Sequence, residues 1–272
     1  NIDFFKNDPP ESVAQKLMCA NLSDLSAMGS FPKAYTLNLS ITSNIDISWL
    51  KKFTNRLLLL QKKYNIYLLG GDISKSKELN LTATFFGEAK LKYILSQNKC
   101  SVGDDIWVTG DLGSSYLGYK ILKNSNLKIS KKHFNFFKKK YLYPNPCMFG
   151  YIASKHINSA IDISDGFYGD LNKLLNTKVG AKIKISKIPI LKKVKRIISE
   201  NKYLLKLEDI ISWGDDYELM FTSSNQNRKH LLLLAKKQNV KLTNIGTIIK
   251  NKGIFDDSMR PIKNLQSFDH FS

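Results

Sequence analysis

Four short segments of the sequence place aspartate beside glycine or serine, residue types that build sites for metal ions and phosphates. Glycine lets a ligand approach the backbone closely. Carboxylates that converge on one site repel each other and need a compensating charge, which Mg²⁺ bound to a nucleotide polyphosphate provides. The pattern therefore indicates a magnesium and nucleotide site, although any one of these aspartates alone is more typical of a turn or a helix cap. The segments are Asn21-Leu22-Ser23-Asp24, Gly70-Gly71-Asp72, Asp162-Ile163-Ser164-Asp165-Gly166 and Gly214-Asp215-Asp216.

Asp24 is the hardest of these aspartates to explain as a turn residue. It falls in the middle of a predicted helix, where aspartate is unfavourable. On a helical wheel it lies about 80° from the apolar stripe, given about 3.6 residues per turn. A helix would hold its carboxylate at the edge of the core, so Asp24 is a candidate ligand.

Helices and strands alternate in the first hundred residues. Asp8 can cap a helix with Pro9 in its first turn, and apolar residues at helical spacing continue to Gly29. Alternation over 35–41 predicts a half-buried strand of an antiparallel type. A second helix is expected over 50–64. Short strands are expected at 66–69, ending in Gly70-Gly71-Asp72, and at 81–87.

The rest of the chain predicts a second group of strands and helices. We expect strands at 104–109, 159–163, 217–222 and 244–249, an edge strand at 182–190, and helices at 114–122 and 131–143. A boundary near 95–103 divides the chain into an N-terminal lobe, 1–97, and a C-terminal α/β lobe, 98–272.

Composition excludes several classes of protein. The 272 residues are 43% hydrophobic and 24% charged, which is typical of a globular chain. Three distant cysteines and four histidines show no disulfide or metal-ligand spacing, and no apolar run approaches the roughly 18 residues of a membrane span. The P-loop, protein-kinase, GxSxG and GxGxxG motifs are absent.

The net charge of +19 raises the possibility of a nucleic-acid partner. The helix expected at 131–143 carries five lysines with three phenylalanines between them, a mixture that can bind phosphates and stack on bases. We favour an amphipathic surface helix with its phenylalanines in the core. Lysines scattered among asparagine and isoleucine are also typical of an AT-rich coding sequence. We therefore do not expect nucleic acid as a partner, despite the net charge.

Taken together, the aspartate segments and two others occur in the order of a known family. The additional segments are Val102-Gly103-Asp104 to Gly110 and the terminal Phe268-Asp269-His270-Phe271. The set resembles thiamine-monophosphate kinase, of the superfamily that includes aminoimidazole ribonucleotide synthetase and selenophosphate synthetase, over nearly the whole chain. The resemblance implies an α/β (α+β) two-lobed fold like that of aminoimidazole ribonucleotide synthetase. Its N-terminal lobe would hold a mixed or antiparallel sheet with helices, bind ATP and metal, and pair in a dimer.

The resemblance also implies an activity and partners. The family transfers the γ-phosphoryl group of ATP to thiamine monophosphate and makes thiamine diphosphate, with several Mg²⁺ ions. We expect a cytoplasmic homodimer that pairs through the sheet of its N-terminal lobe. The acceptor is already an anionic phosphate oxygen, so alignment and charge neutralisation suffice, and we expect direct in-line transfer without a general base or a covalent intermediate.

The family's site residues transfer to this chain by matching motifs. The resemblance implies that the metals are bound by Asp24, Asp72, Asp162 and Asp165. It implies that ATP contacts Gly71, Asp72 and Ser164, with Gln97 where the family has an arginine that meets the phosphates. It implies that substrate contacts Asp3, Asp215 and Phe268, with Asp3 where the family has histidine and Asp215 where it has glutamate.

Alternatives of three other kinds remain open at this point. The family's upstream Asp-Asp and Thr-Asp motifs are expected before residue 1, so the chain is expected to lack its N-terminal segment. It could then be a catalytically impaired homologue that only binds or dimerises. A different substrate within the same superfamily is a second alternative, and the nucleic-acid binder is the third.

Overall fold

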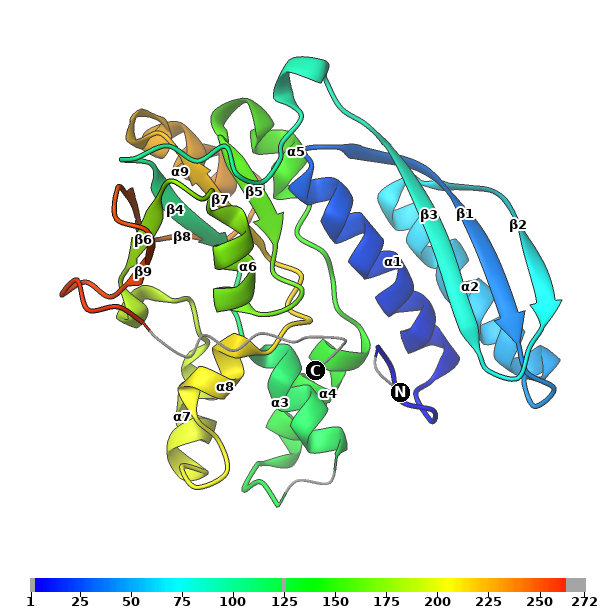
Figure 1. The fold of residues 1–272 in the computed structure, drawn as a ribbon. Coiled ribbons are helices and arrows are strands. Elements are labelled where there is room, and N and C mark those ends of the chain that lie inside the picture. The colour runs from blue at the N-terminus through cyan, green and yellow to red at the C-terminus, as the bar shows by residue number, and fades with distance from the viewer. Residues whose placement is uncertain (1–2, 124–125, 263–272) are drawn as a thin grey trace.

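The computed structural model describes residues 3–123 and 126–262, and α1 lies between two sheets of unequal size (Figure 1). In chain order the elements are α1 (Pro10–Ala27), β1 (Phe31–Ile41), α2 (Ile47–Tyr64), β2 (Tyr67–Lys75), β3 (Asn80–Glu88), η1 (Leu91–Tyr93), β4 (Asp105–Thr109), α3 (Ser114–Leu122), α4 (Lys131–Leu142), α5 (Phe149–Ala153), η2 (Ser154–His156), β5 (Ser159–Asp162), α6 (Phe167–Leu174), β6 (Gly180–Ile183), η3 (Ile185–Lys187), α7 (Lys192–Glu200), α8 (Leu207–Ser212), β7 (Leu219–Ser223), η4 (Asn225–Asn227), α9 (Arg228–Lys237), β8 (Leu242–Ile249) and β9 (Gly253–Phe255).

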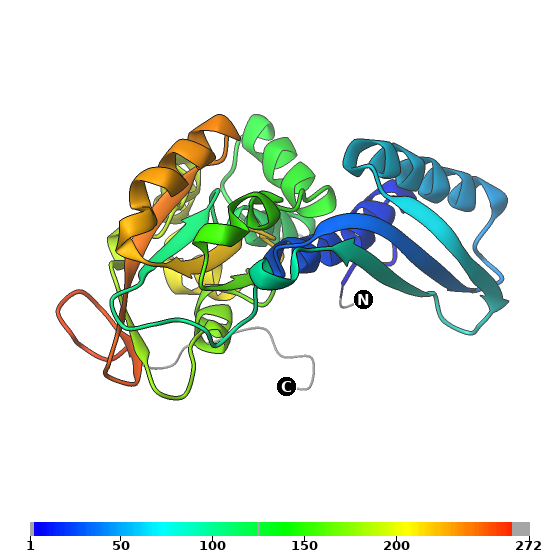
Figure 2. The ribbon, with the colours of Figure 1, turned by 90° about the horizontal axis from the view of Figure 1, so that it is seen from above.

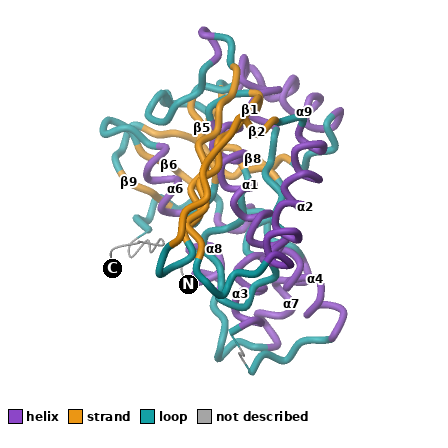
Figure 3. Tube along the Cα trace, turned by 90° about the vertical axis from the view of Figure 1, so that its right-hand side faces the viewer, coloured by secondary structure: helices purple, strands orange, loops and turns teal. Residues whose placement is uncertain are grey.

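The smaller sheet has the strand order β2-β1-β3, and its strands run side by side in Figure 3. The antiparallel prediction for β1 is correct toward β3 and wrong toward β2, which pairs with β1 in parallel. One face of the sheet is buried because Tyr35, Leu37 and Leu39 pack against Phe53 and Leu57 of α2. Figure 2 shows α2 lying along this face.

The helix α1 supplies the rest of that core but begins differently from the prediction. Asp8 does not cap it. Its carboxylate accepts the N–H of Phe5 at 2.9 Å, Pro9 is the N-cap, and Pro10 is the first helical residue. The preceding turn therefore uses the carboxylate that the sequence assigned to the cap. The apolar stripe is confirmed, since Ala14, Met18, Leu22 and Leu25 are buried, whereas Met28 is the exposed C-cap.

The larger sheet has the order β5-β7-β4-β8-β6-β9. Its pairs are antiparallel except β6 with β9. The edge strand predicted at 182–190 is wrong in two respects. β6 ends at Ile183, where the chain enters a 3-10 turn, and it lies between β8 and β9. The three-residue β9 is too short to show a period-2 pattern, so it could not be predicted from the sequence.

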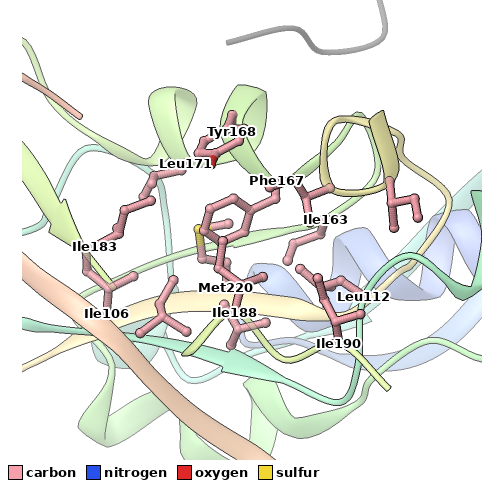
Figure 4. Packing of buried hydrophobic residues seen from close by; sticks show 14 of the residues in the cluster. Ile106, Leu112, Ile163, Phe167, Tyr168, Leu171, Ile183, Ile188, Ile190 and Met220 are labelled. Carbon is pink, nitrogen blue, oxygen red and sulfur yellow. The ribbon is translucent and has the colours of Figure 1, made fainter. Parts of the chain in front are cut away.

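Apolar side chains cover both faces of the larger sheet. On one face, Ile106, Met220 and Ile183 pack against Phe167 and Leu171 of α6 (Figure 4). The opposite face is covered by α5 and α9, whose residues pack on side chains that include Trp107 and Phe221. The β4 and β7 strands are therefore fully buried, and the loops at their ends are held on a rigid support.

The amphipathic interpretation of the basic helix α4 is confirmed. Phe137 is fully buried, and Phe134 and Phe136 pack against the larger core. Of the three rings, Phe137 thus lies in the hydrophobic interior, and the other two are partly buried against it. The mixed α/β architecture with two sheets confirms the predicted fold class. Within the described part of the chain, no helix is both long and apolar enough to span a membrane.

Candidate active site

Three of the predicted aspartates influence one another electrostatically. Asp24 projects from α1, Asp162 ends β5, and Asp165 lies in the loop that follows. Burial, the charge of Asp24 and the charge of Asp165 raise the pKa of Asp162 to about 7, against the side-chain hydrogen bond from Ser23. Partial desolvation by the surrounding protein and then the charge of Asp165 also raise the pKa of Asp24, although its side chain remains exposed to solvent. The fold therefore concentrates negative charge where α1 meets β5.

The loop that carries Ser164 and Asp165 is built around Asp170 in the first turn of α6. One carboxylate oxygen of Asp170 accepts the backbone N–H groups of Ser164, Asp165 and Gly166 at 3.0, 3.0 and 3.1 Å. Burial nevertheless raises the pKa of Asp170 to about 6. Lys173 pairs with both Asp165 and Asp170. This framework fixes the direction in which the loop presents its side chains.

The segment 214–218 lies against that loop. The N–H of Asp215 donates to the carbonyl oxygen of Ser164 at 2.9 Å, and the N–H of Tyr217 donates to Ile163 at 2.9 Å. A Cβ on Gly214 would lie 1.6 Å from the Ser164 oxygen, so only glycine fits there. Both Asp215 and Tyr217 have positive φ, 63° and 51°, a strained conformation that typically persists at functional sites.

The acidic side chains of this segment have different partners. Asp216 accepts the N–H of Gly113 at 3.1 and 2.9 Å, and Gly113 is the N-cap of α3. Glu218 accepts the hydroxyl of Thr109 at 2.7 Å. Asp216 and Glu218 therefore hold the ends of β4 and α3. Asp215 differs from both, because one of its carboxylate oxygens faces the ammonium of Lys16 instead of a strand or helix end.

Lys16 connects Asp215 to the N-terminal segment. Its Nζ lies 3.8 Å from Oδ2 of Asp215, 2.9 Å from the carbonyl oxygen of Asp3, and 3.5 Å from the centre of the Tyr141 ring. The other oxygen of Asp215, Oδ1, accepts the hydroxyl of Tyr217 at 2.9 Å. Two residues predicted to contact substrate, Asp3 and Asp215, are thus joined through one buried lysine.

An aromatic group lies beside this lysine. Tyr119 stacks on Trp213 with ring centres 4.2 Å apart and on Phe5 at 5.7 Å. Tyr141 contacts Phe5 at 5.8 Å and Tyr119 at 6.0 Å. Trp213 immediately precedes Gly214. Aromatic faces next to a carboxylate can bind a cationic aromatic ligand.

Other predicted site residues lie apart from these groups. Gly71 and Asp72 stand inside β2 and not at a strand end, because β2 continues to Lys75. A Cβ on Gly71 would lie 1.8 Å from the Leu37 oxygen, so the sheet itself requires this glycine. Gln97 is in an exposed turn. Within residues 3–123 and 126–262, no side-chain hydrogen bond or ion pair connects these three residues to the aspartates. Phe268 lies outside the described residues.

The donor chemistry of the aspartate cluster fits Mg²⁺, because carboxylate oxygens are its usual protein ligands. The mutual repulsion at Asp24 and Asp162 is what a bound cation would relieve. As the side chains stand, no three His, Cys, Asp or Glu groups in the described part of the chain are close enough to hold an ion together. Phosphate oxygens and water would therefore complete the coordination.

Two residues that organise the site were not anticipated. Asp170 follows Ser164 by six residues and lies in the first turn of α6. A carboxylate in the first helical turn after a glycine loop is a sequence signal from which its role could have been predicted. Lys16 gave no such signal, because one lysine in an amphipathic helix is normally a solvent-facing residue. Only the fold brings α1, α4 and the 214–218 segment together around it.

Known proteins resemble this chain over most of its length. Residues 1–89 match the family model for the AIR synthase related protein, N-terminal domain. A thiamine-monophosphate kinase from Buchnera aphidicola is 37% identical over 277 residues, covering 98% of this chain and 83% of that protein. A thiamine-monophosphate kinase from Escherichia coli is 31% identical over 274 residues, covering 99% of this chain and 83% of that protein.

A solved structure supports the fold assignment. The crystal structure of thiamine-monophosphate kinase from Stenotrophomonas maltophilia superposes with a TM-score of 0.85 at 28% identity, covering 94% of this chain and 82% of that one. The predicted likeness to the aminoimidazole ribonucleotide synthetase fold is therefore confirmed.

Proposed function

Because this chain belongs to the thiamine-monophosphate kinase family, we propose that it phosphorylates thiamine monophosphate with ATP and forms thiamine diphosphate. The observation that carries the proposal is the electrostatic coupling of Asp24, Asp162 and Asp165 beside the Ser164 loop. A carboxylate cluster of this kind suits an ATP polyphosphate that arrives with metal ions.

The chemistry assigned to this chain's own residues is mainly positioning. Asp24, Asp162 and Asp165 would bind Mg²⁺, and we retain Asp72, on β2, as a proposed metal ligand. The metal would neutralise phosphate charge when bound. Gly71, Asp72, Gln97 and Ser164 are the proposed nucleotide contacts. The loop held by Asp170 would fix the phosphates, and the acceptor phosphate needs no strong base to attack.

The thiamine end is proposed to lie at Asp215 and the aromatic group. The Asp215 carboxylate is held by Tyr217 and Lys16 and can accept hydrogen bonds from the N–H groups of a heterocycle. The stacked rings of Tyr119 and Trp213 offer an apolar face to an aromatic cation. We keep Asp3 and Phe268 as proposed contacts at the same end. In this proposal the two substrates lie on opposite sides of the Ser164–Asp215 hydrogen bond.

We also propose a homodimer formed through the smaller sheet. Every residue of β2 is exposed, and the strand is an edge of its sheet. Its apolar side chains include Leu69 and Ile73, 66% and 62% exposed. A second copy would cover this edge, which otherwise favours unspecific strand pairing. The small-molecule substrates are consistent with our expectation of a cytoplasmic enzyme.

Direct transfer separates this proposal from a covalent mechanism. We would incubate the protein with Mg²⁺ and γ-labelled ATP, with and without thiamine monophosphate, and separate protein from small molecules. The proposal predicts labelled thiamine diphosphate and no labelled protein. Label on the protein in the absence of acceptor would contradict direct transfer. Turnover with a formylglycinamidine or selenide acceptor, but not with thiamine monophosphate, would favour another member of the superfamily.

A further inference from the structure

Lys16 is a buried cation to which the proposed phosphoryl transfer assigns no role. Its side chain is only 6% exposed, and lysine is rarely buried unless it is paired. Burial lowers its pKa, whereas Asp215 and Asp8 act in the opposite direction. A buried charge of this kind costs several kcal/mol unless its partners offset the loss of water. Its partners therefore indicate why the fold keeps it.

Those partners come from three distant parts of the chain. The Asp3 carbonyl belongs to the segment before α1, the Tyr141 ring to α4, and Asp215 to the strained turn before β7. Lys16 therefore ties together three segments that have no strand pairing with one another.

The geometry at Asp215 is more specific than a general brace between segments. Its Oδ1 is held by the Tyr217 hydroxyl at 2.9 Å, and Oδ2 faces the Lys16 ammonium at 3.8 Å. Both oxygens thus have a partner that fixes the rotation of the carboxylate. The side chain still keeps 28% of its surface exposed, so it can accept a further hydrogen bond from a ligand.

We propose that Lys16 is a positioning residue for the substrate's heterocyclic end, acting by holding the Asp215 carboxylate and the chain at Asp3 in place. The proposal rests on the proposed function and on the contact assigned to Asp215. Lys16 has no part in binding ATP or in the transfer step. Its loss must therefore weaken binding of thiamine monophosphate selectively.

The test compares Lys16→Met, Lys16→Arg and a matched control. Lys33→Met removes a lysine that also has a carboxylate partner, Glu88 at 2.7 Å, and an aromatic neighbour, Phe31, but at an exposed position in β1. The measurements are kcat, the two KM values, and calorimetric Kd values for thiamine monophosphate and a non-hydrolysable ATP analogue. Thermal unfolding of each variant is recorded alongside.

Lys16→Met is expected to raise the KM and Kd for thiamine monophosphate by about tenfold or more, because a buried partner of Asp215 is removed. The KM for ATP and the kcat should stay within about twofold, as for an interaction that is equally strong in the ground state and in the transition state. Lys16→Arg should recover most of the loss, and Lys33→Met should change neither substrate. Combining Lys16→Met with Asp215→Asn should add little to either single effect.

Several results would overturn the proposal. One is an unchanged KM and Kd for thiamine monophosphate in Lys16→Met. Another is a parallel loss of ATP-analogue binding with a lowered unfolding temperature, which would make Lys16 a purely structural brace. If Lys16→Met does not fold, Tyr141→Leu removes the ring over the ammonium and must give a smaller rise confined to the same substrate. An unmodified protein that binds ATP but neither binds nor converts thiamine monophosphate would overturn the proposed function and this role together.

Discussion

The N–H of Asp215 donates a hydrogen bond to the carbonyl oxygen of Ser164 over 2.9 Å. This bond joins the residue proposed for the thiamine end to the loop proposed for the phosphates. Tyr217 makes the same kind of bond to Ile163. The two bonds fix the spacing between the two proposed substrate positions. Alignment of that sort is the main contribution a protein makes to phosphoryl transfer.

Gly214→Ala should disrupt that alignment. The added Cβ would stand 1.6 Å from the Ser164 oxygen, so the 214–218 segment must move away from the loop. We expect kcat/KM to fall by about 100-fold, the loss typical of a misplacement near 1 Å. Steady-state kinetics would show it. Gly103→Ala has open space around its Cβ but a φ of 90°, so it reports backbone strain alone and should leave kcat/KM nearly unchanged.

Asp170→Ala should loosen the Ser164 loop. The change leaves three backbone N–H groups without their common acceptor. We expect a loss of about 2–4 kcal/mol in the free energy of unfolding, measured by urea denaturation. Asp257→Ala, at an exposed position, should stay within about 0.5 kcal/mol. Equal stability of the two variants would show that the loop does not depend on Asp170.

The pKa of Asp162 predicts a pH dependence of the metal-free protein. Because its folded pKa of about 7 lies above the ordinary value near 4, ionising it costs stability as the pH rises from about 4 to about 7. In the presence of a chelator, the unfolding temperature should therefore have a component that falls over this range. Asp162→Asn should remove that component, because the amide does not titrate.

Added Mg²⁺ should oppose the same effect. The ion binds the ionised carboxylate, so its stabilisation should be large at pH 8 and small at pH 5.5, where Asp162 keeps a proton. Differential scanning fluorimetry with and without Mg²⁺ would measure both. Stabilisation by Mg²⁺ of the same size at both pH values, or in Asp162→Asn, would argue against Asp162 as a ligand.

Ile73→Lys should weaken the proposed dimer. It places a charge at an exposed position of the edge strand β2, where a partner sheet would have to bury it. Sedimentation velocity should show a shift from dimer to monomer. Leu233→Lys, on α9 and 67% exposed, is the matched control and should leave the mass unchanged. A monomeric unmodified protein would contradict the dimer.

Regular elements could be predicted because their patterns are local. The helix expected at 114–122 is α3 with the same bounds, and the stripe of Ala14 and Met18 is buried. Strand neighbours depend on distant segments, and this explains the parallel β2 and the interior position of β6. The end of a strand is similarly hard to place. Gly70-Gly71-Asp72 has turn composition, yet β2 passes through it because Gly71 fits against Leu37.

The candidate site was predictable as a set of aspartates but not as a set of roles. The sequence places Asp215 and Asp216 side by side, whereas the fold gives one to Lys16 and the other to the N–H of Gly113. Which neighbour faces the substrate depends on the strained turn at Asp215 and Tyr217. That turn produces no periodic pattern in the sequence, so it could not be predicted.

The most direct test of the account is the formation of thiamine diphosphate by this 272-residue chain. The protein would be mixed with Mg²⁺, ATP and thiamine monophosphate, and products would be separated by chromatography, with Asp162→Asn run in parallel. We predict that the protein forms ADP and thiamine diphosphate in equal amounts, and that the variant loses nearly all of this activity. Hydrolysis of ATP without thiamine diphosphate, or a variant as active as the unmodified protein, would contradict the account.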